Sequence, residues 1–117
     1  MAIRTKRVYD RPAGQDGYRV LVDRVWPRGL SKGRARVDEW LKEVAPSTGL
    51  RKWFGHDPGK WHEFRRRYFK ELERHETALE PLRRRARRGR VTLLFGAKDT
   101  ERNNAVALKA YLEGEKA

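Results

Sequence analysis

Two apolar runs stand out in the pattern of hydrophobic and polar positions, and both are typical of strands. In residues 18–23 (YRVLVD), a tyrosine and two valines alternate with Arg19 and Leu21, which predicts a buried or half-buried strand. Residues 91–95 (VTLLF) are continuously apolar, as in a strand that is buried on both faces of a parallel sheet. Weaker alternation over residues 3–9 (IRTKRVY) predicts another strand near the start of the chain.

Periodicity and capping residues predict helices over most of the remaining chain. The expected helices cover residues 37–44, 50–54, 61–74, 77–88 and 101–112. We expect Ser47 or Thr48 to cap the second of these, Asp57 to cap the turn that leads into the third, and Asp99 or Thr100 to cap the last, because short polar side chains accept hydrogen bonds from free N–H groups at helix starts.

Strands separated by helical crossovers imply a parallel sheet. The sequence therefore predicts an α/β fold: a small three-layer, Rossmann-like domain with a short, mostly parallel sheet of three strands and flanking helices. The length of 117 residues suits a single domain over residues 1–117.

Composition excludes several classes of protein and suggests one class of partner. The chain has no cysteine, which rules out disulfides and thiolate metal sites. No apolar run approaches the roughly 20 residues that span a membrane, and the first residues lack the apolar core of a signal peptide, so we expect a cytoplasmic protein with no membrane partner. The net charge of +13 favours an anionic partner, either a small molecule or a nucleic acid.

The densest basic segment lies in the helix predicted over residues 77–88 and just beyond it. It consists of Arg83, Arg84, Arg85, Arg87, Arg88 and Arg90. Such a cluster can hold a phosphate backbone, but a run of charge is often only a solvated helix face. Both interpretations stay open from the sequence.

Charged pairs follow two of the predicted strands. Asp23 and Arg24, with Arg28 nearby, come after the strand of residues 18–23, and Lys98 and Asp99 come after that of residues 91–95. Because ligands bind at the carboxyl ends of parallel strands, these groups would form an anion pocket, with Asp23 or Asp99 as a general base. The alternative is that the two pairs neutralise each other at the edge of the sheet.

Three other side chains are candidates for the same site. His56 suits an acid–base role, because histidine is the side chain type that can change charge near neutral pH, or axial ligation of haem. Trp26 would stack on a planar ligand, or pack against Trp53 in the core. Asn104, at the start of the last predicted helix, would add a hydrogen bond. The three histidines lack the close spacing of a metal-ligand pair, so we expect no metal site.

Three segments in order resemble the DUF488 family, within it the short YeaO-like branch. They are YRVLVDRVWPRG, VDEWLKEVAPSTGLRKWFGHD and VTLLFGAKDTERNNAVALKAYL, and the resemblance extends over residues 4–112. The polar signature of the family matches Asp23, Arg24, Pro27, Arg28, Gly29, Lys42, Ser47, Arg51, Trp53, Phe54, Gly55, His56, Asp57, Lys98, Asp99 and Asn104.

The resemblance implies a compact Rossmann-like α/β domain and little about activity, because the family is named for its unknown function. It adds Arg51 to the expected ligand-binding residues. Longer members often carry a Cys-His-Arg-like segment after the last strand, where this chain has ERNN at residues 101–104. A thiol-dependent role therefore does not transfer to this chain.

Three functions remain open from the sequence. The first is a pocket for a nucleotide or another phosphorylated ligand, with Asp23, His56 and Asp99 as candidate catalytic groups. Its ligand-binding residues would be Arg24, Trp26, Arg28, Arg51, Lys98 and Asn104. The second is a nucleic-acid-binding module without sequence specificity, and the third is a haem or other planar-cofactor binder. Neither a catalysed reaction nor a particular cofactor follows from the sequence.

Overall fold

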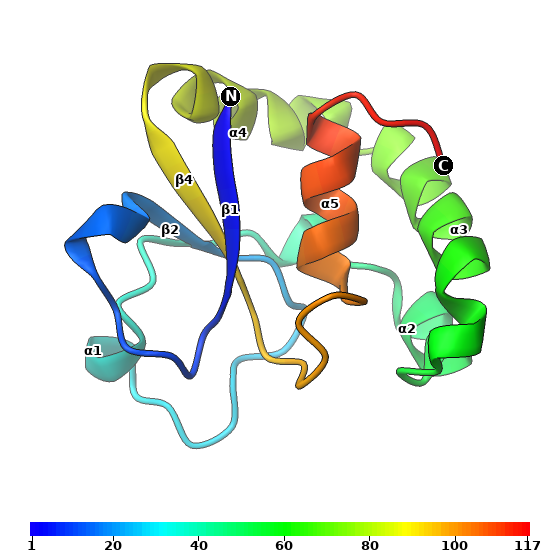
Figure 1. The fold of residues 1–117 in the computed structure, drawn as a ribbon, viewed down its shortest axis with the longest axis horizontal. Helices are drawn as coiled ribbons and strands as arrows, with labels where there is room; N and C mark the ends of the chain where they lie inside the picture. The colour runs from blue at the N-terminus through cyan, green and yellow to red at the C-terminus, as the bar shows by residue number, and fades with distance from the viewer.

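The structure, a computed structural model, describes all 117 residues and is an α/β fold (Figure 1). Its single sheet has four parallel strands in the order β1-β4-β2-β3. The strands are β1 (Ala2–Arg7), β2 (Tyr18–Leu21), β3 (Glu39–Trp40) and β4 (Arg90–Phe95). The α-helices are α1 (Lys32–Ala35), α2 (Thr48–Phe54), α3 (Trp61–Glu73), α4 (Glu76–Arg88) and α5 (Asn104–Leu112). Three 3-10 turns complete the chain: η1 (Gly14–Asp16), η2 (Lys42–Val44) and η3 (Pro58–Lys60).

Strand β4 lies inside the sheet, between β1 and β2. Val91, Leu93 and Phe95 face the main core, whereas Leu94 faces a smaller cluster on the opposite side. The hydroxyl of Thr92 donates a hydrogen bond of 2.7 Å to the backbone carbonyl of Asp16. The prediction of a strand buried on both faces is therefore confirmed.

The two faces of the sheet are covered differently. Helices α2 to α5 contribute to the main core on one face, and Figure 1 shows α5 beside β1 with α3 farther out. The other face is covered by the long connection between β2 and β3, which includes α1. Trp26 and Leu30 of this connection and Trp40 of β3 pack against Leu21 and Leu94. None of the helices combines the length and the apolar character needed to cross a membrane.

The prediction of a helix over residues 37–44 is wrong. The backbone of this segment pairs with the edge of β2 instead: Asp38 N–H donates to the Arg19 carbonyl, and Leu41 N–H donates to the Leu21 carbonyl. The adjacent side chains of Trp40 and Leu41 consequently belong to the clusters on opposite faces of the sheet, as alternation along a strand requires. The segment forms β3 and η2, so the sheet has four strands rather than the predicted three.

The predicted helix caps are confirmed at two places and wrong at a third. Ser47 accepts a hydrogen bond from Leu50 N–H at the start of α2, and Asp57 caps η3. Helix α5 begins three residues later than predicted, and Asn103 caps it instead of Asp99 or Thr100. Asp99 closes the preceding turn by accepting from the N–H groups of residues 101 and 102.

A candidate binding pocket at the carboxyl ends of β2 and β4

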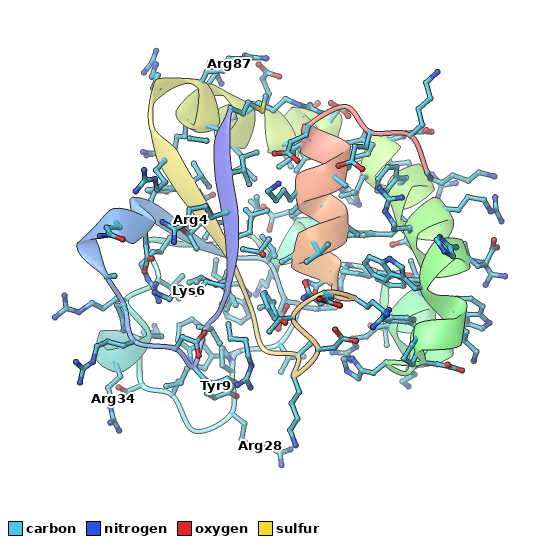
Figure 2. The ribbon with its side chains drawn as sticks, in the orientation of Figure 1. Arg4, Lys6, Tyr9, Arg28, Arg34 and Arg87 are labelled. Carbon is cyan, nitrogen blue, oxygen red and sulfur yellow. The ribbon has the colours of Figure 1, made fainter.

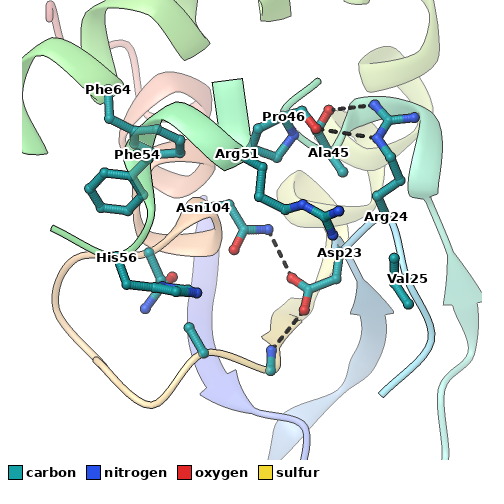
Figure 3. Close-up of a pocket in the computed structure, with 13 residues that line it drawn as sticks. Asp23, Arg24, Val25, Ala45, Pro46, Arg51, Phe54, His56, Phe64 and Asn104 are labelled. Carbon is teal, nitrogen blue, oxygen red and sulfur yellow. Dashed lines mark hydrogen bonds between the residues drawn. The ribbon is translucent and has the colours of Figure 1, made fainter. Parts of the chain in front are cut away.

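A pocket of about 250 Å³ opens where β2 and β4 end (Figure 3). Segments from six parts of the chain meet there: the residues after β2, the stretch between η2 and α2, helix α2 with the residues after it, one residue of α3, the turn after β4 and the start of α5. Its lining consists of Asp23, Arg24, Val25, Ala45, Pro46, Arg51, Phe54, His56, Phe64, Gly96, Ala97, Asn103 and Asn104. Ligands of open parallel sheets bind at this edge, so the position agrees with the rule for such folds.

The carboxylate of Asp23 is the central acceptor of the pocket. Its Oδ1 accepts from Asn104 Nδ2 at 2.9 Å, and its Oδ2 accepts from Gly96 N–H at 2.9 Å. Burial raises the pKa of this carboxyl above its ordinary value, although both hydrogen bonds and the nearby positive charge of Arg51 and His56 act in the opposite direction. Asp23 thereby ties the ends of β2 and β4 to the start of α5.

Gly96 allows the turn after β4 to approach Asp23 closely. A Cβ atom at this position would lie 3.2 Å from Asp23 Oδ2, which is tighter than an ordinary van der Waals contact. The absence of a side chain thus permits the 2.9 Å hydrogen bond from Gly96 N–H to the carboxylate.

Helix α2 and the two residues after it carry the basic groups of the pocket. Ser47 caps the helix, and its Oγ also donates to Glu71 Oε2 at 2.6 Å, which attaches α2 to α3. At the other end, Gly55 and His56 both adopt positive φ, 53° and 58°. A non-glycine residue in this region is uncommon and is often found where a side chain must be aimed. Here the two residues bring the His56 ring to the pocket.

Arg51 and Arg24 are held in different ways. Arg24 donates from Nη2 to the Ala45 carbonyl at 3.1 Å and from Nε to the Pro46 carbonyl at 3.3 Å. Arg51, in contrast, makes no side-chain hydrogen bond and no ion pair, and its guanidinium points toward Asp23 (Figure 3). Arg51 is therefore the arginine that is free to bind an anion.

The start of α5 supplies neutral polar groups. Asn103 is buried and caps the helix, accepting from Val106 N–H at 2.9 Å. Asn104 donates through Nδ2 to both Asp23 and the Val22 carbonyl. The amide oxygen of Asn104 has no hydrogen-bond partner within the protein, so it can accept from a ligand. Because helix N-termini carry partial positive charge, this end of α5 also favours a negative group in the pocket.

Four of the predicted site residues lie outside the pocket. Trp26 forms an edge-to-face pair with Trp40 and donates to the Leu30 carbonyl at 2.7 Å, so it belongs to the smaller core. The side chain of Arg28 is exposed on the loop after β2 (Figure 2). The expectation that Arg28 would lie close to the charged pair that follows β4 is therefore wrong.

Lys98 and Asp99 also lie outside the pocket, because they lie in the turn after β4 beyond the residues that line it. Asp99 is held by the backbone N–H groups of residues 101 and 102, which lower the pKa of its carboxyl. Lys98 is exposed. Neither side chain pairs with Asp23 or Arg24, so the alternative of mutual neutralisation at the sheet edge is wrong as well.

Sequence reasoning missed the apolar wall of the pocket. Phe54 and Phe64 stack with ring centroids 4.2 Å apart, and both line the cavity. Phe64 fits the apolar stripe of its helix, and periodicity alone cannot distinguish a core position from one that also borders a cavity. The family resemblance included Phe54 but assigned it no contact.

The pocket thus presents two kinds of binding group next to an aromatic wall. Arg51 and His56 suit a negatively charged group. The Asp23 carboxylate and the Asn104 amide oxygen are acceptors, and they suit the hydroxyl groups of a ligand. A volume of about 250 Å³ lies just below the usual range of ligand pockets, about 300–1,000 Å³. This size favours a ligand no larger than a sugar phosphate or small nucleotide over a porphyrin.

Replacing Ser47 by alanine should lower the free energy of unfolding by about 1–2 kcal/mol, because the change removes an N-cap and a hydrogen bond to Glu71. Urea denaturation would measure the loss. Thr48→Ala is the matched control, since Thr48 is exposed and its side chain makes no hydrogen bond. Equal stability of the two variants would contradict the capping role.

Comparison with known proteins identifies related sequences that match over nearly their whole length. A family model described as "Inactive DUF488-N3 subclade" (DUF488-N3i) matches residues 2–117. The chain is 46% identical over 112 residues to the uncharacterized protein YeaO of Escherichia coli K12, with 96% of this chain and 97% of the relative covered. It is 42% identical to the uncharacterized proteins Mb3100c of Mycobacterium bovis and Rv3073c of Mycobacterium tuberculosis H37Rv, with 96% of this chain and 94% of each relative covered. No solved structure matches the chain.

Proposed function

We propose that this chain, which belongs to the DUF488-N3i family, is a binding protein for a small phosphorylated ligand that also carries hydroxyl groups, such as a nucleotide or sugar phosphate. The observation that carries the proposal is the unpaired guanidinium of Arg51, which points into a pocket beside His56 and the acceptors Asp23 and Asn104. Arg51 and His56 would bind the phosphate, and the two acceptors would bind hydroxyl groups.

Binding without turnover fits the family better than catalysis does. The matching model is described as an inactive subclade. Both carboxylate oxygens of Asp23 already accept hydrogen bonds from the protein, and these bonds would hold the group as a fixed acceptor. Asp99 lies outside the pocket. We therefore assign Asp23 and His56 to ligand binding and leave Asp99 out of the site.

Arg51→Ala should weaken binding of adenosine monophosphate or ribose 5-phosphate about 10- to 100-fold, as expected for the loss of one charge-assisted hydrogen-bonding group. Isothermal titration calorimetry would measure the dissociation constants. Lys52→Ala is the matched control, because Lys52 is the next residue on α2, carries the same charge and does not line the pocket.

Two further ligands sharpen this experiment. Adenosine and inorganic phosphate each lack one half of the proposed ligand, so both should bind more weakly than the monophosphate. Equal affinity of the wild type and Arg51→Ala for every phosphorylated compound, or no binding by the wild type, would contradict the proposal. Phosphorus NMR on the same mixtures should show the ligand unchanged with time, and release of phosphate would restore the catalytic interpretation.

A further inference from the structure

A second hollow, of about 420 Å³, lies at the opposite end of the sheet from the pocket. It is located where β2 and β4 begin, beside the last turns of α4. Four of its seven lining residues are arginines, and the full lining consists of Tyr18, Pro81, Arg84, Arg85, Arg88, Gly89 and Arg90. We call this hollow the arginine groove. No lining residue is shared with the pocket described above.

The structure divides the basic cluster of the sequence into two groups. Arg83 pairs with Glu76, and Arg87 lies 3.8 Å from a carboxylate oxygen of Glu80. These two arginines therefore have carboxylate partners within the protein. The remaining members of the cluster, Arg84, Arg85, Arg88 and Arg90, face the groove, and none of them has a carboxylate within 4 Å.

The groove arginines also make few side-chain hydrogen bonds within the protein. Arg84, Arg85 and Arg88 make no side-chain hydrogen bond within the protein. Arg90 donates to the Gln15 carbonyl at 2.9 Å, and Arg4 of the neighbouring strand donates to the same carbonyl at 3.4 Å. Four guanidinium groups around one hollow repel each other, so an anion placed among them would be strongly favoured.

One aromatic contact gives the groove a stacking surface. The guanidinium carbon of Arg85 lies 3.7 Å from the centroid of the Tyr18 ring. At the hydroxyl end of this ring, Tyr18 donates to Glu39 Oε1 at 2.9 Å, which holds the ring in place. Arg85 is exposed, so its guanidinium remains accessible to a ligand, and bases of single-stranded nucleic acids stack on guanidinium planes.

We propose that the arginine groove binds the backbone of a single-stranded nucleic acid, with phosphates on Arg84, Arg88 and Arg90 and a base stacked on Arg85. Arg84 and Arg88 are one helical turn apart on α4, which places them side by side along the groove. A concave groove fits a strand better than a flat lipid surface. The net charge of +13 adds long-range attraction for any polyanion.

The test is fluorescence anisotropy with labelled 20-nucleotide oligo(dT) and oligo(U) at several salt concentrations. The wild type should bind at 50 mM salt with an affinity that falls steeply as salt rises. The Arg84→Ala, Arg88→Ala double variant should lose about 20-fold in affinity near 0.1 M salt, and its log–log salt slope should fall by about 1.4, the counterion release of two single-strand phosphate contacts.

The matched control removes the same charge elsewhere. Lys32→Ala, Arg34→Ala changes two exposed residues of α1 that have no ion-pair partner, and Arg34 lies far from the groove end of the molecule (Figure 2). The affinity of this control variant for the oligonucleotides should be nearly that of the wild type. Stronger binding of oligo(U) than of oligo(dT), or the reverse, identifies the preferred strand and supports the proposal in either case.

Three results would overturn the proposal. The first is no oligonucleotide binding by the wild type at 50 mM salt. The second is an equal loss in the groove variant and the α1 control, which would mean general attraction rather than a site. The third is binding to phosphatidylserine vesicles that depends on Arg84 and Arg88, together with oligonucleotide binding that does not. None of these variants changes the pocket, so the outcome is independent of the function proposed for it.

Discussion

Asp16→Ala is expected to lower the free energy of unfolding by about 3–5 kcal/mol, because it leaves a buried arginine without its counter-charge. The side chains of Asp16 and Arg19 are only 2% and 5% exposed, and Asp16 Oδ2 accepts from Arg19 Nη1 at 2.5 Å. The same carboxylate accepts from Lys6 Nζ at 3.1 Å and from Ala13 N–H at 2.9 Å. One substitution therefore removes the acceptor of three donors at the start of β2.

The effect should depend on pH in a defined direction. Burial by itself raises the pKa of the Asp16 carboxyl, but the hydrogen bonds from Ala13, Lys6 and Arg19 outweigh it, so the pKa in the folded protein lies below its ordinary value. A carboxyl with a lowered pKa stabilises the fold fully above its unfolded pKa of about 3.9 and loses that contribution as the pH falls through the folded pKa. The stability difference between wild type and Asp16→Ala should thus be constant from about pH 5 to 8 and shrink below about pH 4.

Urea denaturation at a series of pH values measures both effects. Glu63→Ala is a suitable control, because Glu63 pairs with Arg66 and Arg67 on the exposed surface of α3 and its removal should change stability little. If Asp16→Ala were no more destabilising than this control, the buried ion pair would not hold η1 against β2.

Phe64→Ala is expected to cost about 3–5 kcal/mol of unfolding free energy, the usual range for deleting a buried aromatic ring. Phe64 is 2% exposed and packs between three aromatic rings. Its centroid is 4.2 Å from that of Phe54, 5.7 Å from that of Tyr68 and 5.8 Å from that of Trp61. The loss should lie near the lower end of the range, because the vacated space joins the pocket and water can enter it.

Two measurements distinguish this effect from a general weakening of α3. Thermal or urea denaturation gives the stability loss, and His62→Ala, an exposed position on the same helix, should leave stability nearly unchanged. Phe64→Leu is a milder substitution. Isothermal titration calorimetry of this variant, under conditions where it is folded, should show weaker binding of the phosphorylated ligand, because the substitution alters the wall of the pocket. A loss in Phe64→Ala as small as that in His62→Ala would contradict the packing of Phe54 on Phe64.

Much of the fold is predictable from local sequence patterns. Alternating and continuous apolar runs locate three of the four strands, and helical apolar stripes locate α2, α3 and α4 within a few residues. These patterns suffice because each reflects the period of one element buried on one or two faces. Strand β3 escapes them: its apolar spacing fits a helix, and only pairing with the edge of β2 makes it extended.

The position of the candidate site in the fold is predictable from the sequence, but the set of residues that forms it is not. Asp23 and Asn104 lie at the carboxyl edge as expected, and Asp23 accepts a hydrogen bond from Asn104. Asp99 was expected to join them, but its carboxylate is satisfied by its own turn. Trp26 was a candidate for ligand stacking, and it is instead half-buried and packed against Trp40. In each case a contact that a linear pattern does not contain determined where the side chain points.

The sequence by itself therefore determined the class of fold, the edge of the sheet where polar groups gather, and the large positive charge. These properties depend on periodicity, strand ends and composition, which are local or additive. Only the tertiary structure decided that Arg51 rather than Arg28 faces Asp23, and that four of the clustered arginines line a groove while two are paired on a helix surface. Those outcomes depend on which segments distant in the chain pack together, because a charged side chain is available to a ligand only where no neighbouring segment has already neutralised it.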